Sequence, residues 1–360
     1  MNKQNKQYTI PVGTGLFGRV INASGEPVDN KGALANAQRV SVIEPVDTTT
    51  GQAHQMFETG IKVIDLLAPL AQNGITGIFG VYGVGKIVVM DEIMYNLIHH
   101  YNGVIVGLTM DEAYENSTLH EAIQEFDDAD KRKFVTLFEP LADSAEVRRK
   151  LLLAGLTIAE HSQQSGQQVL LVADENVVTK GTSEQIRAWK DTLRASHIPA
   201  LFLGDYEDLQ SRREDMLYNL DSCIVLSQAM AKQSLWPAVD RLASTSVLLD
   251  NNLVSQEHVQ VAQQVRQLLR LYMELQDVQN TETLTTEDRQ VLTRGKRVQK
   301  FFMQPFFIAE AYTDIPGEYV PVATTIQDFK DLLAGRYDDV DVEAFSFVGT
   351  LAQALAKAQK

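Results

Sequence analysis

The sequence predicts an α/β fold in which a mainly parallel β-sheet is covered by helices on both faces, followed by a C-terminal helical bundle. Short, continuously apolar runs recur between about residues 57 and 250, and helix-like segments separate several of them. Continuous apolar strands that alternate with helices are typical of parallel sheets buried on both faces. After about residue 255, apolar residues recur instead with the spacing of amphipathic helices.

The composition is that of a globular protein with an acidic surface. Of 360 residues, 44% are hydrophobic, and 32 Lys and Arg stand against 47 Asp and Glu, which gives a formal net charge of −15. Such a surface repels phosphate backbones, so we expect no nucleic-acid partner. A local cluster of backbone amides can nevertheless bind phosphate groups on an acidic protein.

Several features predict a cytoplasmic protein. The single cysteine, Cys223, cannot form an intrachain disulfide, which fits a reducing compartment. The polar N-terminus indicates no signal peptide, and no segment approaches the roughly 18 to 20 apolar residues of a membrane span. We therefore expect contact with a membrane only indirectly, through a complex.

The chain divides by pattern into three predicted segments. Residues 1–56, rich in Gly, Pro, Asn and Asp, indicate an N-terminal arm of strands and turns. Residues 57–250 form the predicted α/β core, with strands at 77–80, 104–108, 135–138, 169–173, 200–203 and 223–226. Residues 251–360 form a helical domain, with one helix on the apolar stripe 261–275, a polar turn at 280–288, and further helices at about 287–303, 325–335 and 342–358.

A glycine-rich segment after the first core strand has the form of a phosphate-binding P-loop. Gly80-Val-Tyr-Gly83-Val-Gly85-Lys86-Ile87 lies between the apolar run 75–79 and a helix-like segment. The glycines let backbone amides point at phosphate groups, the helix N-terminus adds partial positive charge, and the lysine reaches the terminal phosphates. The alternative is a glycine-rich turn that binds no ligand. The predicted ATP- or ADP-binding residues of this segment are Gly80, Gly83, Val84, Gly85, Lys86, Ile87 and Val88.

Two further positions concern magnesium. The P-loop pattern requires Ser or Thr after the lysine, but Ile87 offers no metal ligand, so we expect weakened Mg²⁺ binding. The apolar strand 169–173 ends in Asp174, which is the form of a Walker B strand whose aspartate holds the magnesium shell. Asp174 is therefore the predicted metal-binding residue.

Ordered matches along nearly the whole chain resemble the beta subunit of F-type ATP synthase. Gly60-Ile-Lys-Val-Ile-Asp-Leu-Leu-Ala-Pro69 is similar to the family's signature before its P-loop. The resemblance implies a RecA-like P-loop NTPase core and a C-terminal helical bundle, in a subunit of a rotary ATPase head. The other similar segments are 11–13, 18–22, 25–29, 153–160, 237–246, 304–310, 333–338 and 344–349.

The resemblance also implies partners. Family members form rings with alpha subunits and bind nucleotide at the interfaces, so we expect an alpha-like subunit or a second copy of this chain. The segment 282–288 lies where the family has an acidic loop that touches the central stalk, and a solvated helix–turn–helix tip is the alternative. The family's N-terminal barrel is expected to be absent, because the similarity begins about ten residues after Met1.

The resemblance assigns three aromatic residues to an adenine pocket. Trp236 falls where the family has Tyr, Phe306 falls on a family Phe, and Tyr312 falls on another Phe position. Aromatic faces stack on a purine whatever their exact type. Ordinary core packing is the alternative role for these rings.

Other positions depart from the family pattern. Asp111 falls where the family has its catalytic glutamate, so a carboxylate is kept but withdrawn by one methylene. A displacement of about 1 Å can cost on the order of a hundredfold in rate. Glu112 and Val178 stand where the family has phosphate-facing arginines. Asp111 and Lys86 are the predicted catalytic residues.

These departures predict nucleotide binding without efficient turnover. Features that hold a nucleotide are kept, whereas features that bind metal or stabilise transition-state charge are lost. We therefore expect a beta-like, pseudo-catalytic subunit of a rotary-type ATPase complex. Two alternatives are a slow ATPase that uses Asp111 with an arginine supplied by its partner, and a non-enzymatic interaction subunit with a vestigial site.

Overall fold

The computed structural model describes residues 8–42, 44–46, 55–141, 144–276 and 284–359. Among these residues, no helix combines the length and hydropathy that a membrane span requires. The chain divides into two compact units. Unit 1 comprises Met1–His54, Ala71–Phe79 and Met94–Asp221, and unit 2 comprises Gln55–Leu70, Gly80–Ile93 and Ser222–Lys360.

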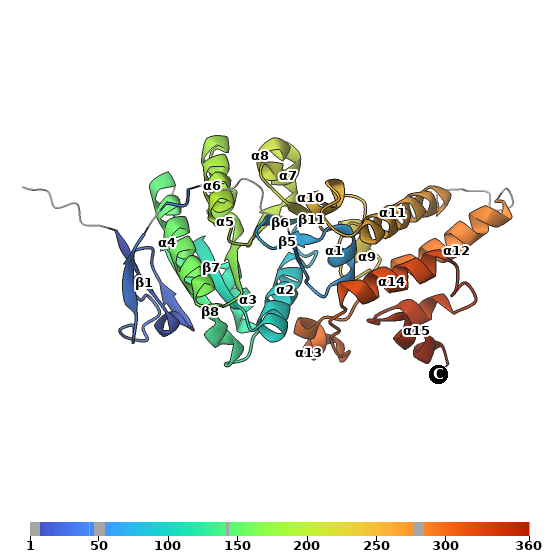
Figure 1. Ribbon diagram of the computed structural model, residues 1–360, viewed down its shortest axis with the longest axis horizontal. Coiled ribbons are helices and arrows are strands. Elements are labelled where there is room, and N and C mark those ends of the chain that lie inside the picture. Colours follow the sequence, from blue (N-terminus) through green and yellow to red (C-terminus); the bar gives the residue numbers. More distant parts are fainter. Residues whose placement is uncertain (1–7, 43, 47–54, 142–143, 277–283, 360) are drawn as a thin grey trace, which may run out of the picture. The chain divides into compact units, whose positions relative to one another are not determined.

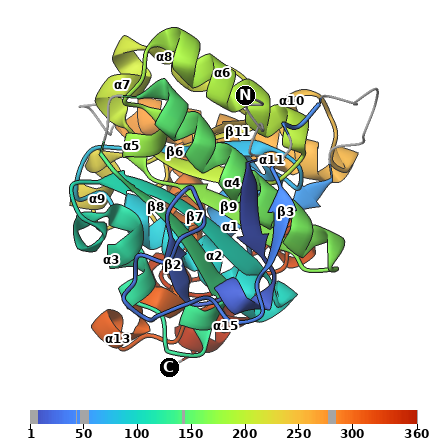
Figure 2. The same ribbon diagram turned by 90° about the vertical axis from the view of Figure 1, so that its left-hand side faces the viewer.

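Unit 1 is built on a mainly parallel β-sheet. Its strands lie in the order β6-β10-β9-β7-β8-β2, and the neighbouring pairs from β10 to β2 run parallel. Figure 2 shows α4 lying across these strands. A parallel sheet with flanking helices confirms the α/β class predicted from the sequence. The strands are β2 (Arg19–Ile21), β6 (Ile75–Gly80), β7 (Val104–Asp111), β8 (Phe134–Pro140), β9 (Val169–Ala173) and β10 (Ala200–Asp205).

The N-terminal strands and the helices complete unit 1. Strand β1 pairs antiparallel with β3, whereas β2 joins the main sheet beside β8. The N-terminal region therefore contributes a strand to the core sheet. The remaining elements are β1 (Thr9–Val12), η1 (Thr14–Leu16), β3 (Gln38–Ser41), η2 (Tyr114–Asn116), α3 (Thr118–Gln124), η3 (Asp130–Lys133), α4 (Ala145–Gln164), α5 (Glu175–Val178), α6 (Ser183–Ser196), α7 (Tyr206–Ser211) and α8 (Arg213–Leu217).

The strand β7 is covered on both faces, which explains its continuous apolar run. Adjacent residues of a strand point to opposite faces. A Cβ added to Gly107 would lie 2.2 Å from the side chain of Leu119 on α3, and a Cβ added to Gly155 on α4 would lie 2.5 Å from the side chain of Leu108. Helices α3 and α4 therefore cover opposite faces of β7, and both approaches are too close for a larger residue at the glycine.

The long helices of unit 2 pack side by side. Figure 1 shows α11, α12 and α14 in mutual contact. Helix α11 buries Val261, Val265, Leu269 and Tyr272 of the stripe predicted from the sequence, whereas Leu268 and Leu275 are half-buried. The elements of unit 2 are β4 (Met56–Phe57), α1 (Lys62–Leu67), β5 (Leu70–Ala71), the first half of α2 (Lys86–Tyr101), β11 (Ser222–Val225), α9 (Gln228–Lys232), β12 (Thr245–Ser246), α10 (Val247–Asp250), α11 (Gln256–Gln276), α12 (Thr286–Phe301), η5 (Phe307–Ala309), α13 (Glu310–Thr313), α14 (Val322–Leu333), η6 (Val342–Phe345) and α15 (Leu351–Ala358).

The C-terminal helix predicted at 342–358 is interrupted. The chain forms η6, leaves the helical conformation at Phe347, where φ is 52°, and starts again as α15. A left-handed residue cannot continue a right-handed helix. Thr350 and Gln353 form a capping box that begins α15. The polar turn predicted at 280–288 lies partly outside the described residues, and its described end holds Thr285, the N-cap of α12.

Candidate functional site

The glycine-rich segment forms a loop between β6 and α2. Gly83 and Gly85 have φ angles of 81° and 88°, which L side chains rarely adopt. A Cβ on Gly80 would lie 2.7 Å from the side chain of Val84, so the turn also needs glycine there. Lys86 is the first residue of α2, so the amides at the helix N-terminus begin where the loop ends. The predicted strand–loop–helix arrangement is present.

One cavity of unit 2 brings the loop together with the three predicted aromatic residues. It has a volume of about 330 Å³. Val84, Gly85 and Val88 line it from the loop and the first turn of α2, and Trp236, Phe306 and Tyr312 line it from segments far along the chain. The loop approaches Trp236 at Gly85, where an added Cβ would lie 3.4 Å from the indole. The backbone of the loop therefore lies beside this ring.

The three rings differ in exposure. Phe306 is buried at 6% exposure, Trp236 is 36% exposed, and Tyr312 is 75% exposed. Phe306 thus forms part of the buried wall of the cavity, whereas Trp236 and Tyr312 also expose ring surface. Core packing accounts for the burial of Phe306, whereas most of the Tyr312 side chain is exposed. The remaining lining residues are Val89, Pro237, Ala238, Gln304, Pro305, Ala309, Thr313, Ile315 and Phe347.

Gln304 fixes the segment that carries Phe306. Its amide Nε2 donates to the carbonyls of Gly60 at 2.7 Å and Glu318 at 2.6 Å, and its Oε1 accepts from the amide of Lys62 at 2.8 Å. Gln304 is 3% exposed, so these bonds satisfy a buried side chain. We predicted no role for Gln304 from the sequence, although its place just before Pro305 and Phe306 was the available signal.

Glu92 ties the same segment to α2. It is completely buried, and its Oε2 accepts from the amide of Ile308 at 3.2 Å. Helix α2 begins at the loop, so this contact couples the helix after the loop to the segment that holds Phe306 and Tyr312. A glutamate inside an amphipathic helix gives no sequence signal for such a role, because its partner lies more than two hundred positions along the chain.

The cavity offers little polar side-chain chemistry. The Oε1 and Nε2 atoms of the Gln304 side chain both form hydrogen bonds with backbone groups. The Thr313 hydroxyl donates to the carbonyl of Ala309 at 2.9 Å. Most of the other lining residues are apolar or aromatic. The arrangement therefore suits a flat apolar ring held by stacking, next to a loop of backbone amides that suits phosphate.

Asp174 and Asp111 belong to unit 1, at the carboxyl ends of neighbouring parallel strands. The register pairs Leu108 of β7 with Ala173 of β9, so the two aspartates follow within a few residues on adjacent strands. Asp174 is 4% exposed. Its Oδ1 accepts from the amide of Val177 at 3.2 Å as the N-cap of α5, and its Oδ2 accepts from the hydroxyl of Thr109. Both carboxyl oxygens are therefore already engaged.

Burial raises the pKa of the Asp174 carboxyl to about 7, and the negative charge of Asp111 contributes to the same direction. The hydrogen bonds from Thr109 and Val177 oppose this shift but do not cancel it. Asp111 itself is half-buried at the end of β7, and its Oδ1 accepts from the amide of Glu112 at 2.7 Å. Asp111 is thus the more accessible of the two carboxyl groups.

The two positions predicted to have lost arginine differ in surroundings. Glu112 is exposed just beyond β7. Val178 is 2% exposed and lines a separate apolar cavity of unit 1. Next to it, the guanidinium of Arg212 donates to the carbonyls of Thr179 and Gly181 at 3.2 and 3.0 Å, which fixes the chain after α5. A charged side chain at 178 would be buried in this environment.

The described residues offer few ligands for a magnesium ion. Ile87 has no oxygen, and each oxygen of the buried Asp174 already accepts one hydrogen bond, which leaves only its remaining lone pairs. Within the described part of the chain, no group of three or more His, Cys, Asp or Glu side chains is arranged to hold a metal ion. Any magnesium would therefore depend on ligands from the nucleotide and water.

A P-loop between a strand and a helix, on a mainly parallel sheet with flanking helices, defines an α/β nucleotide-binding fold. Residues 60–188 match the family model of the ATP synthase alpha/beta family, nucleotide-binding domain. The match includes the loop, α2, Asp111 and Asp174, and it ends before Trp236, Phe306 and Tyr312. Over this stretch the chain is similar to the alpha and beta subunits of that family.

Proposed function

We propose that this chain is a beta-like nucleotide-binding subunit of a rotary-type ATPase complex, which binds ATP or ADP and has weak or lost hydrolysis. The observation that carries the proposal is the cavity of unit 2, where the P-loop residues Val84 and Gly85 lie beside Trp236, Phe306 and Tyr312. The rings would stack on the purine, and the loop amides with Lys86 would hold the phosphates.

The same proposal explains why turnover would be weak. Position 87 lacks the hydroxyl that ligates magnesium, and Asp174 is buried with both oxygens engaged. Positions 112 and 178 carry no cation. Since these groups act on the charge that develops during phosphoryl transfer, their loss lowers the rate far more than the affinity. An alpha-like subunit, or a second copy of this chain, would complete the ring.

Asp111 supports a second candidate, a slow ATPase. Its half-buried carboxyl group at the end of β7 is open enough to accept a proton from water. The charge on the transferred phosphoryl group would then be stabilised by an arginine from the partner. Steady-state ATP hydrolysis, measured with the chain alone and with an alpha-like partner, separates the candidates. Turnover that needs the partner and is lost in Asp111→Asn would establish the slow ATPase, and brisk turnover by the chain alone would contradict both proposals.

The dependence of ATP affinity on magnesium tests the binding proposal directly. By calorimetry, we expect removal of Mg²⁺ with a chelator to change the wild-type affinity by less than about threefold, because the P-loop offers no metal ligand. Ile87→Thr restores the hydroxyl, and we expect it to give about a tenfold preference for Mg–ATP. Ile87→Val is the matched control, since valine has the shape of threonine without the hydroxyl. A strong magnesium dependence in the wild type, or an equal response in both variants, would contradict the interpretation.

Base selectivity gives another prediction. Of the polar side chains that line the described cavity, Gln304 and Thr313 are already hydrogen-bonded to the backbone, so neither is placed to distinguish the amino group of adenine from the oxygen of guanine. A site that does not hydrogen-bond a substrate group cannot strongly reject its analogue. We therefore expect the Kd for GTP to lie within about tenfold of that for ATP in parallel calorimetric titrations. A preference for ATP above about a hundredfold would show that a recognition group has been missed.

A further inference from the structure

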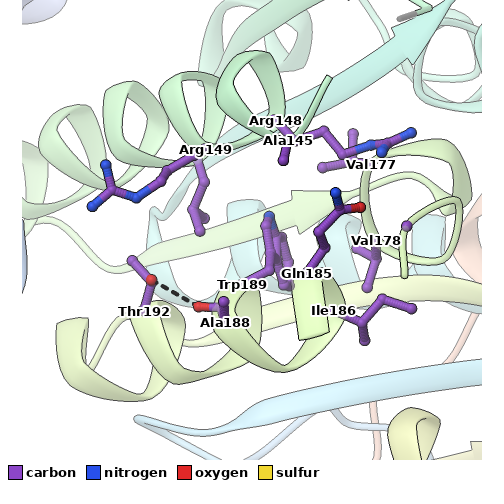
Figure 3. A pocket seen from close by; sticks show the side chains of 12 residues that line it. Ala145, Arg148, Arg149, Val177, Val178, Gln185, Ile186, Ala188, Trp189 and Thr192 are labelled. Carbon is purple, nitrogen blue, oxygen red and sulfur yellow. Dashed lines mark hydrogen bonds between the residues drawn. The ribbon is translucent and has the colours of Figure 1, made fainter. Parts of the chain in front are cut away.

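A second cavity, in unit 1, has the character of a ligand site and plays no part in the proposed nucleotide binding. It lies between α4 and α6 and has a volume of about 130 Å³. Figure 3 shows the side chains that surround it. Its walls are mainly apolar, with Leu152 from α4, Val177 and Val178 from α5, and Ile186 from α6. Apolar walls alone would indicate a void left by packing, so the polar groups determine whether the cavity can bind a ligand.

The indole of Trp189 is the central polar group of this cavity. Trp189 is 6% exposed, and its Nε1–H has no hydrogen-bond partner. Figure 3 shows this nitrogen on the edge of the ring that faces α4 across the cavity. An unsatisfied buried donor costs about 1–3 kcal/mol and is uncommon in native proteins. A ligand with an acceptor atom in the cavity would remove that cost.

The remaining polar groups also favour an acceptor that carries negative charge. Gln185 lines the cavity, and its Oε1 accepts from the amide of Thr182 at 3.0 Å, which leaves the donor end of its amide for other contacts. Arg148, which is 6% exposed, and Arg149, whose side chain is 55% exposed, also line the cavity and leave α4 in opposite directions. No acidic side chain is among the described lining residues.

The ion pair of Arg149 does not prevent this guanidinium from meeting a ligand. Arg149 contacts Glu44, but the two side chains are 55% and 58% exposed. Exposed pairs of this kind contribute about 0–1 kcal/mol, so Arg149 can turn to a competing anion at little cost. Thr192 offers no donor to a ligand, since the one proton of its hydroxyl is donated to the carbonyl of Ala188 at 2.9 Å.

We propose that this cavity binds a small monocarboxylate with an apolar body of up to about six carbons, its carboxylate accepting from Trp189 and facing Gln185 and Arg149. The size follows from the volume, because a dry cavity of about 150 Å³ holds one benzene molecule. The apolar walls would bury the body of the ligand, and the donors would orient its carboxylate.

Nuclear magnetic resonance of the full-length chain tests the proposal with benzoate as the probe. The sequence has two tryptophans, Trp189 and Trp236, so the spectrum has two indole N–H signals, which Trp189→Phe and Trp236→Phe assign. We expect benzoate to shift the Trp189 signal and not the Trp236 signal, with a Kd of about 1 mM or tighter. Benzamide has the same shape without the charge, and we expect it to bind at least about fivefold more weakly.

Variants then identify the groups responsible, with benzoate binding measured by ligand-observed resonance. Ala188→Leu fills the cavity and should abolish binding, while Trp189→Phe and Arg149→Gln should each weaken it by about fivefold or more. Circular dichroism and thermal unfolding verify that each variant is folded, and Trp236→Phe should bind as the wild type does. A Trp189 signal unmoved by about 10 mM benzoate, or equal binding of benzamide, would overturn the proposal. Nucleotide affinity is a separate readout, so failure here leaves the proposed function unaffected.

Discussion

Replacing Trp236 with alanine is expected to weaken ATP binding by about tenfold to a hundredfold, because removing an aromatic face that stacks on a base costs about 1–3 kcal/mol. The indole lies against Gly85 of the loop and is partly exposed to the cavity, so its face is the surface that a purine would contact. Calorimetric titration of the variant with ATP measures the loss.

Two controls separate stacking from general disruption. Trp236→Phe keeps an aromatic face and should retain affinity within about threefold of the wild type. Trp189→Phe changes the other tryptophan, which lies in the cavity of unit 1, and should leave ATP binding unchanged. Full ATP affinity in Trp236→Ala would show that the cavity of unit 2 does not hold the base. A parallel loss in Trp189→Phe would indicate a folding defect instead.

Replacing Asp174 with asparagine is expected to change the pH dependence of stability by up to about 4 kcal/mol, since each pKa unit corresponds to about 1.4 kcal/mol. Burial raises the pKa of this carboxyl from 3.8 to about 7 in the folded chain. The folded state therefore holds the proton more tightly than the unfolded state does.

The sign follows from that difference. The stabilising contribution of the raised pKa is fully present below about pH 4 and is lost as the pH rises through about 7. Asparagine cannot ionise, so the free energy of unfolding of Asp174→Asn should fall less than that of the wild type between pH 4 and 8. The amide oxygen can still accept from Val177, and the amide nitrogen can donate to the Thr109 hydroxyl.

Urea denaturation at several pH values measures this effect. Asp65 is the matched comparison, because burial also raises its pKa to about 7. Its carboxylate accepts from the amides of Thr59 and Gly60 and from the Thr59 hydroxyl, so Asp65→Asn loses acceptors and should destabilise the chain at every pH. An unchanged pH profile in Asp174→Asn would show that this carboxyl titrates normally and is more accessible than the structure indicates.

The sequence was sufficient for those features that depend on local pattern. Runs such as 104–108 and 169–173 predicted buried parallel strands because both faces of each strand need apolar residues. The spacing 261–275 predicted α11, whose buried residues follow that stripe. The glycines of 80–85 predicted a loop between a strand and a helix, and in that loop Gly83 and Gly85 have positive φ angles.

The helix predicted at 342–358 was wrong in its middle for a local reason. Ala344, Phe345, Phe347 and Val348 favoured one continuous helix, and the prediction gave them more weight than the helix-start signal of the Thr350 and Gln353 capping box. A correct prediction has to compare the capping signal with the apolar periodicity. The left-handed backbone of Phe347 shows that the capping signal, and not the periodicity, matches the structure here.

By itself the sequence determined the α/β class, the position of the glycine loop and the types of residue that could hold a nucleotide. Only the tertiary structure decided how those residues are used: that Trp236, Phe306 and Tyr312 line one cavity with the loop, that Gln304 and Glu92 fix this segment, and that both oxygens of Asp174 are engaged. The unpartnered indole of Trp189 likewise became visible only there. The reason is that hydrogen-bond satisfaction and cavity volume depend on contacts between residues far apart in the chain, which no local spacing encodes.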